Sequence, residues 1–204
     1  MNTRNINTAN INTDNIAQMR RELRTARRSL SPTVRARLSQ ALVRHLLRSS
    51  LLWPARRIAC FWPNDGEIDL RSLFDSLWQR DIQVLLPIID GQRLWFAPYT
   101  TSTAMRSNRF GIQEPALKRQ DACPLLAIDV ILMPLVAFDD VGNRVGMGGG
   151  YYDRTLANLR HREHFRGPLL IGTAFAFQRR EQLCANTWDI PMHGVATEEG
   201  LNLF

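Results

Sequence analysis

The sequence has few of the residues that build many known active sites. Its three cysteines, Cys60, Cys123 and Cys184, are far apart and form no C-x-x-C motif or zinc-type cluster. We expect all three to be reduced and structural. None of the four histidines stands in a plausible Ser/His/Asp or Cys/His context, so the sequence does not indicate a covalent hydrolase.

Long apolar runs are also missing. No stretch of about 18 apolar residues occurs, so we expect no membrane span. The N-terminus lacks the basic region followed by an apolar core that marks a secretory signal. Both absences predict a cytoplasmic protein. The 204 residues, 45% of them hydrophobic and 22% charged, fit one α/β domain with a substantial core.

Lysine is almost absent. Of the 26 lysine and arginine residues only Lys118 is a lysine, and the net charge is +7. We interpret this skew as a general coding preference. Basic charge favours anionic partners, but the arginines are spread along the chain and accompany no aromatic-interleaved RNA-binding motif. We therefore predict a monomer with small-molecule partners and without nucleic acid or membrane, and a basic nucleic-acid-binding protein stays an alternative.

The order of apolar segments predicts the architecture. Residues 1–15 form an Asn-rich segment, which we expect to be a disordered tail, and residues 16–204 form the domain. Alternating strands and helices indicate a single three-layer α/β/α domain with a mostly parallel sheet. We expect helices over 16–29, 32–47, 67–80, 151–160 and 179–184, and strands over 57–62, 82–87, 94–99, 128–136, 169–174 and near 195–197.

The most distinctive stretch runs from Gly142 to Asp153. It places five glycines within nine residues between an apolar run and a helical segment. This order presents backbone N–H groups to an anion, although a mobile surface loop is the alternative. The loop is no Walker A motif, because no Gly-Lys-Ser/Thr ends it. It is no dinucleotide fingerprint either, because Tyr151 stands where the third glycine is needed.

Ligands of such a sheet lie beyond the carboxyl ends of its strands. That edge would collect residues 62–67, Phe110, the glycine loop and Asp189. Backbone donors, acids and aromatic rings favour ATP-dependent chemistry with Mg²⁺ on an aromatic small molecule. Two readings stay open here. Glu67 is a ligand contact or a helix-dipole partner, and the basic helix 16–29 leans over the loop or has a merely solvated face.

Four ordered segments resemble the 5-formyltetrahydrofolate cyclo-ligase family. The most specific is MPLVAFDDVGNRVGMGGGYYDRTL at 133–156, which is similar to the glycine-rich signature of that family. The others are FWPNDGEID at 61–69, NRFGIQEP at 108–115 and WDIPMHGVATEE at 188–199. The resemblance covers the chain from about Ala17 to its end and excludes the Asn-rich segment. It implies a Rossmann-like fold of the NagB/RpiA/CoA-transferase type.

The resemblance also implies a reaction and its residues. ATP and Mg²⁺ convert 5-formyltetrahydrofolate to 5,10-methenyltetrahydrofolate, with an N5-iminium phosphate as intermediate and ADP and phosphate as products. It assigns catalysis to Arg144, Tyr151 and Tyr152, and Mg²⁺ binding to Asp153 and Asp189. It assigns ATP binding to Arg20, Arg144, Val145, Gly146, Met147, Gly148, Gly149, Gly150, Tyr151, Tyr152 and Asp153. It assigns folate binding to Trp62, Glu67, Phe110, Gly148, Gly149, Gly150, Tyr151 and Tyr152.

The chain departs from the family pattern in two places. A lysine is usual four residues before the helix arginine, where this chain has Ile16, so Arg21 or Arg24 would have to replace it. The loop also lacks a further basic residue, which leaves more of the charge neutralisation to Arg144. A non-catalytic nucleotide- or folate-binding protein of the same fold is therefore the alternative to an enzyme.

Overall fold

Two long helices begin the chain. The computed structural model describes residues 4–159 and 167–204, and side chains from Asn15 onwards. Helix α1 spans Arg4–Ser29 and α2 spans Pro32–Arg48. Ser31 caps α2, because its side chain accepts a hydrogen bond from the backbone N–H of Val34, and Pro32 suits the first helical position. The predicted start of α2 is therefore confirmed.

A mostly parallel sheet forms the centre of the described part. Its strand order is β11-β10-β9-β6-β1-β2-β3, in which the outer pairs β10–β11 and β2–β3 are antiparallel and the inner pairs are parallel. This confirms the predicted α/β class. The strands are β1 Arg57–Ala59, β2 Gln83–Asp90, β3 Arg93–Pro98, β6 Val130–Pro134, β9 Leu169–Thr173, β10 Gly194–Ala196 and β11 Leu201–Leu203.

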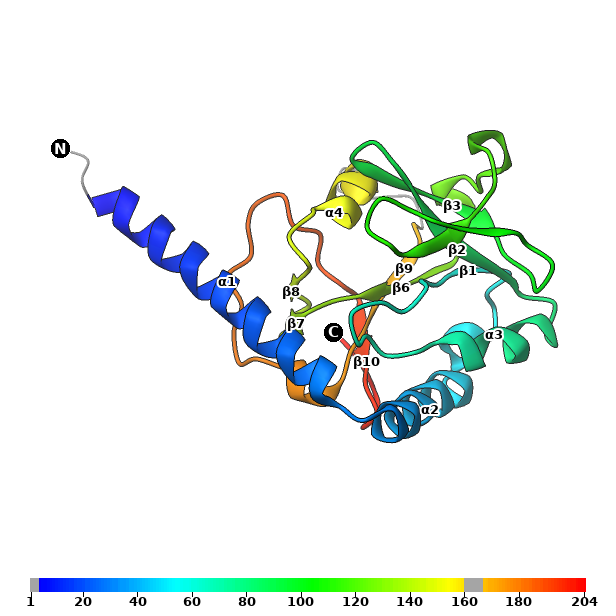
Figure 1. Cartoon of the computed structure of the whole chain (residues 1–204), viewed down its shortest axis with the longest axis horizontal. Coiled ribbons are helices and arrows are strands. Elements are labelled where there is room, and N and C mark those ends of the chain that lie inside the picture. The colour runs from blue at the N-terminus through cyan, green and yellow to red at the C-terminus, as the bar shows by residue number, and fades with distance from the viewer. Residues whose placement is uncertain (1–3, 160–166) are drawn as a thin grey trace.

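Helices cover both faces of this sheet (Figure 1). Alternate strand residues such as Ile58 and Leu132 pack with α2 and with α3, Arg71–Trp78. Their neighbours, such as Ala59 and Ile131, pack on the other face with Leu156 of α4, Tyr151–Leu156. Strands buried on both faces explain the continuous apolar runs of the sequence.

Short elements complete the fold. Hairpins β4–β5 and β7–β8 lie outside the main sheet. Their strands are β4 Met105–Ser107, β5 Gln113–Pro115, β7 Ala137–Phe138 and β8 Arg144–Val145. The 3₁₀ turns are η1 Ser50–Leu52, η2 Arg119–Asp121, η3 Leu125–Ala127, η4 Ala157–Leu159 and η5 Ala176–Gln178. In the described part of the chain, no helix is both long and apolar enough to cross a membrane.

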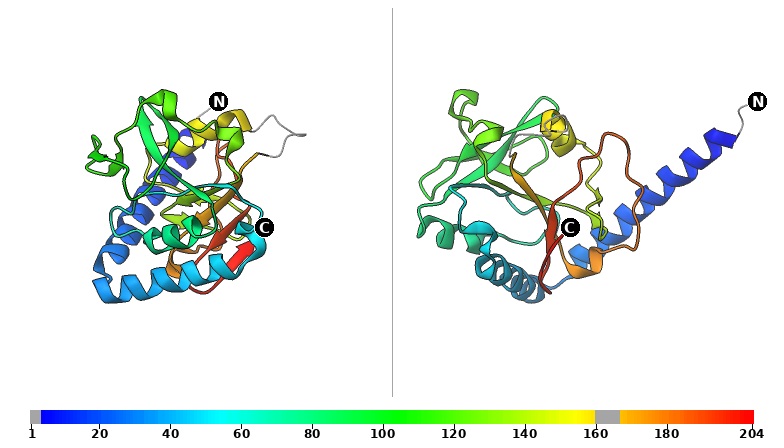
Figure 2. Two further views of the ribbon diagram at one scale, coloured as in Figure 1. Left: turned by 90° about the vertical axis from the view of Figure 1, so that its right-hand side faces the viewer. Right: turned by 180° about the vertical axis from the view of Figure 1, so that it is seen from behind.

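Several boundaries differ from the prediction. Helix α1 begins at Arg4, so most of the segment interpreted as a tail is helical here, and its first half projects away from the body (Figure 1 and the right view of Figure 2). Residues 179–184 form no helix, and β11 was not predicted. Helix α3 begins at Arg71, four residues after Glu67, and no acid stands in its first turn. The helix-dipole reading of Glu67 is therefore wrong.

The turn of the β7–β8 hairpin generates a prediction. Gly142 has a φ of +90°, and a Cβ there would lie 2.6 Å from the carbonyl oxygen of Met192. Gly142→Ala is expected to lower the free energy of unfolding by about 2–4 kcal/mol, because backbone strain and a steric clash add. Gly91→Ala is the control, since Gly91 has a φ of +56° and open space around it. It should cost only about 1 kcal/mol. Equal losses in urea unfolding would contradict the clash.

Candidate functional site

The site lies where two neighbouring parallel strands end. Strands β1 and β6 pair directly, so the segments that follow them meet at one edge of the sheet. The first segment contains Asp65 and Glu67, and the second leads through β7 and β8 into the glycine loop. Helix α1 passes beside both segments (Figure 1).

Apolar contacts hold α1 in this position. Leu23 is buried with Val136, Ala137, Val145 and Leu183, and Ile16 and Met19 pack against the same cluster. Ile16, which replaces the lysine usual in the resembling family, thus serves as an apolar anchor of the helix. Of its two suggested substitutes, Arg21 is exposed and Arg24 is paired with Asp65 at 2.7 Å.

Helix α1 contacts the glycine loop through Arg20. The Nε atom of Arg20 donates a hydrogen bond of 2.9 Å to the carbonyl oxygen of Gly146. Further along the helix, the Nη2 atom of Arg27 lies 4.0 Å from the Sδ atom of Met147. Of the two readings of this helix, the structure supports the one in which its arginines lean over the loop.

In the glycine loop, backbone carbonyl groups accept hydrogen bonds from the protein, whereas the backbone N–H groups are available to a ligand. Gly148 and Gly150 adopt φ values of +97° and +61°, a region that glycine enters without steric cost. The carbonyl oxygen of Gly146 accepts from Arg20, and that of Gly149 accepts from Arg154. Among the described residues, no acceptor bonds to the backbone N–H groups of residues 146–150. Such a loop is suited to an anion.

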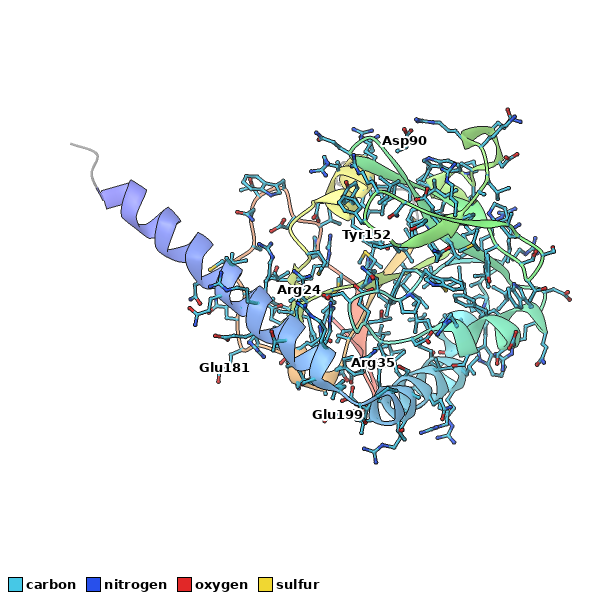
Figure 3. The ribbon with its side chains drawn as sticks, viewed as in Figure 1. Arg24, Arg35, Asp90, Tyr152, Glu181 and Glu199 are labelled. Atoms are coloured by element: carbon cyan, nitrogen blue, oxygen red, sulfur yellow. The ribbon has the colours of Figure 1, made fainter. Side chains whose placement is uncertain are left out.

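A buried ionic cluster lies beneath α1. The Arg27 side chain is 1% exposed, and its Nη2 atom lies 2.9 Å from the Oδ2 atom of Asp65. Arg24 and Arg28 also pair with Asp65 (Figure 3 labels Arg24). Burial acts to raise the pKa of Asp65, but the ion pairs with Arg24 and Arg27 hold it below its usual range. Asp65 is therefore the charged partner that lets α1 bury an arginine.

Glu67 occupies a less polar position in the same cluster. Its side chain is 11% exposed, and its carboxyl group lies 3.9 Å from the Nη1 atom of Arg27 and accepts from the backbone N–H of Asn64 at 3.0 Å. Burial raises its pKa to about 7, and Arg27 and the Asn64 N–H oppose that rise. Glu67 can therefore gain or lose a proton near neutral pH.

Tyr152 completes the buried group. It lies on the side of α4 that faces the sheet (Figure 3). Its hydroxyl group is buried and has no hydrogen-bond partner among the described residues. Burial and then the charge of Glu67 raise its pKa, while Arg144 acts in the opposite direction. A buried hydroxyl without a partner is rare in folded proteins, and a bound water or a ligand would supply the missing hydrogen bond.

Arg144 joins α4 to the segment that carries Asp189. Its guanidinium donates to the carboxylate of Asp153 and to the carbonyl oxygen of Ile190. The two acids predicted to bind a metal therefore stand on segments that one arginine connects. The described residues contain no group of three or more His, Cys, Asp or Glu side chains able to hold a metal ion alone. Two carboxylates suit Mg²⁺ when substrate phosphates and water supply its other ligands.

The aromatic residues of the predicted site separate into two places. Phe110 and Tyr151 pack edge to face with their ring centroids 5.9 Å apart, and the Tyr151 hydroxyl accepts from Arg109. Trp62 instead packs on Tyr99 with the ring centroids 5.9 Å apart. The guanidinium carbon of Arg71 lies 5.3 Å from the centroid of the Trp62 ring. The structure thus joins Phe110 to the glycine loop, whereas the contacts of Trp62 belong to the cluster around α3.

Sequence reasoning gave no individual role to three residues of this region. Arg27 and Asp65 form the buried ion pair, and Arg109 contacts both aromatic rings beside the loop. A signal for Arg27 was present in the sequence, because it lies seven residues after Arg20 and one turn after Leu23, hence on the same side of the helix. Asp65 and Arg109 stand in turns, where the sequence gives no comparable periodicity.

Comparison with known proteins gives concordant matches. The model of the 5-formyltetrahydrofolate cyclo-ligase family matches residues 12–198. The 5-formyltetrahydrofolate cyclo-ligase of Haemophilus influenzae is 37% identical over 181 residues, 87% of this chain and 95% of the relative. The Escherichia coli protein of that name is 36% identical over 178 residues, 86% and 96%. The solved 5,10-methenyltetrahydrofolate synthetase of Aquifex aeolicus superposes with a TM-score of 0.78 at 29% identity, covering 92% of both chains.

The raised pKa of Glu67 generates a stability prediction. Its folded-state pKa of about 7 exceeds the ordinary 4.5, so folding favours the protonated carboxyl group. That contribution is complete below about pH 4.5 and is lost as the pH rises to 7. Glu67→Gln imitates the protonated form. Its free energy of unfolding relative to the native chain should therefore rise by about 1–3 kcal/mol between pH 5 and pH 8.

Urea unfolding at both pH values measures this difference. Glu181→Gln is the control, because it removes the same charge from an exposed position (Figure 3). A Glu67→Gln difference that is equal at pH 5 and pH 8 would show that burial does not disfavour the Glu67 carboxylate.

Proposed function

Because this chain belongs to the 5-formyltetrahydrofolate cyclo-ligase family and is an enzyme of that activity, we propose that it uses ATP and Mg²⁺ to close the methenyl ring. The formyl oxygen of 5-formyltetrahydrofolate attacks the γ-phosphorus of ATP, and ADP leaves. N10 then attacks the iminium carbon and releases its proton, and the C–O bond breaks to release phosphate with the former formyl oxygen. The product is 5,10-methenyltetrahydrofolate.

The glycine loop carries this proposal. Its carbonyl oxygens at Gly146 and Gly149 are engaged by arginines, so its N–H groups are the part available to phosphate oxygens. Arg20 and Arg144 border the loop and supply positive charge. Phosphoryl transfer depends mainly on positioning and charge neutralisation. The absence of a protein nucleophile from the described site therefore agrees with the reaction.

The folate ring would bind on the Glu67 side of the loop. A pterin presents two neighbouring N–H donors, which match the two oxygens of an ionised carboxylate. The Tyr152 hydroxyl group is also buried and has no hydrogen-bond partner among the described residues, so it is available to bond to a ligand. Phe110 and Tyr151 offer ring faces beside the loop. Trp62 stays a prediction for the folate pocket.

Asp153 and Asp189 would hold Mg²⁺ together with the phosphates. Asp153 stands in the first turn of α4, and Arg144 links it to the segment next to Asp189. When bound, the metal screens the phosphate charge that would otherwise repel the formyl oxygen. Arg144 orients Asp153, so it acts on the same charge from the protein side. That the protein is a cytoplasmic monomer and binds no nucleic acid stays a prediction.

The deciding experiment is incubation with 5-formyltetrahydrofolate, Mg²⁺ and ATP. We expect the methenyl chromophore and ADP to appear together in equal amounts. Nucleotide and folate binding without ATP-dependent chromophore would instead support a non-catalytic binding protein. Retention on nucleic acid at physiological salt, with a steep salt dependence, would support the nucleic-acid alternative.

Tyr152 generates a prediction with two opposite readouts. Tyr152→Phe removes a buried hydroxyl group without a partner, so the free energy of unfolding should rise by about 1 kcal/mol. The same variant should lose about tenfold in kcat/KM, because the ligand loses its hydrogen bond. In the control variant Tyr151→Phe the hydroxyl that accepts from Arg109 is lost, so stability should not rise. Full activity of Tyr152→Phe would contradict the ligand role.

A further inference from the structure

The buried guanidinium of Arg27 stands between the two carboxylates of the site. We propose that Arg27 is a positioning residue that keeps Glu67 ionised and oriented for the pterin, and that Asp65 limits this effect by sharing the same charge. The inference rests on the proposed folate role of Glu67. It concerns a residue that touches neither substrate in the proposed binding mode.

The two terminal nitrogens of Arg27 have separate neighbours. Its Nη1 atom donates to the carbonyl oxygen of Leu135 at 3.2 Å and lies 3.9 Å from the Oε1 atom of Glu67. Its Nη2 atom donates to the Oδ2 atom of Asp65 at 2.9 Å. The hydrogen bond to Leu135, directly after β6, fixes the orientation of the guanidinium against the sheet. Each carboxylate therefore meets one side of a single positive charge.

Burial makes this charge effective. The Arg27 side chain is 1% exposed, and the Glu67 and Asp65 side chains are 11% and 13% exposed. Little solvent lies between them, so their charges act on one another more strongly than surface charges do. Gly66 allows the close approach, because a Cβ there would lie 3.1 Å from the backbone of Arg27. The short distance between α1 and this loop is thus encoded at residue 66.

The groups that face Glu67 define the expected electrostatics. Arg27 and Arg24 of α1 favour its ionised form, and Asp65 of its own loop disfavours it. The charge of Glu67 also raises the pKa of Tyr152 of α4, so the two groups interact electrostatically. Removing the charge of Arg27 should move the titration of Glu67 to higher pH. Removing the charge of Asp65 should move the titration of Glu67 to lower pH, because Asp65 has the same negative charge as Glu67 and pairs with the same arginine, Arg27.

The experiment measures 5-formyltetrahydrofolate binding without ATP between pH 5.5 and 9 by calorimetry. In the native chain the affinity should fall as the pH drops through about 7. Arg27→Gln should raise that midpoint by about one pH unit, and Asp65→Asn should lower it by a similar amount. Kinetically, the pH dependence of the folate KM should shift in the same direction as the binding midpoint in each variant.

Arg28→Gln is the matched control. Arg28 is the next residue and lies 3.2 Å from the same Asp65 carboxylate, but its side chain is 54% exposed. This variant should leave the midpoint unchanged. Arg27→Lys keeps the positive charge but has one terminal nitrogen where arginine has two. The midpoint of this variant should therefore lie between those of the native chain and Arg27→Gln. If Arg27→Gln does not fold, Asp65→Asn and Arg27→Lys still decide the sign.

Opposite shifts in Arg27→Gln and Asp65→Asn support the inference, since a general structural defect would not produce them. Shifts in the same direction, or a midpoint that Asp65→Asn leaves in place, would overturn it. Carboxyl ¹³C NMR of Glu67 in the ligand-free protein reads the same titration without folate. An inverse pair of NMR shifts in a protein that makes no methenyl product would refute the proposed ligase turnover and leave the Arg27 electrostatics intact.

Discussion

The burial of one arginine charge is the interaction on which the site depends. Helix α1 reaches the sheet edge only with the Arg27 guanidinium beneath it, and an unpaired charge there would cost several kcal/mol. The Leu135 carbonyl and Asp65 accept hydrogen bonds from its two terminal nitrogens, so α1 can dock, although its buried Nε atom has no hydrogen-bond partner among the described residues. Docking then brings Arg20 to the carbonyl oxygen of Gly146. A contact made on the Asp65 side thus positions a charge beside the glycine loop.

The site also holds groups that the protein alone leaves unsatisfied. Glu67 is a carboxyl group in surroundings that disfavour its charge, and the buried Tyr152 hydroxyl has no hydrogen-bond partner among the described residues. Both groups lower the stability of the free protein and gain a partner when a ligand of matching chemistry binds. They are therefore better explained by ligand recognition than by folding.

Local signals predicted most of the framework and little of the charge network. The Ser31-Pro32 start of α2 and the apolar run of β6 depend on neighbouring residues, so the sequence displays them. Strand β11 pairs with β10 at the sheet edge through tertiary contacts, and its three residues give no local pattern. Glu67 was expected in a helix because an apolar periodicity follows it. The helix begins only at Arg71, since the preceding turn is held against α1 by Gly66 and the Asp65 ion pairs.

The same reasoning explains why the glycine loop matches neither familiar phosphate fingerprint. Those motifs combine strand, loop and charge within one short segment, so that their spacing is readable. Here the amides come from residues 146–150, while the arginines come from α1 at Arg20 and from β8 at Arg144. Ile16 contributes apolar packing that anchors α1, at a position where the family usually has a charged side chain. The proposed phosphate site is assembled by the docking of a helix, so its recognition requires the fold.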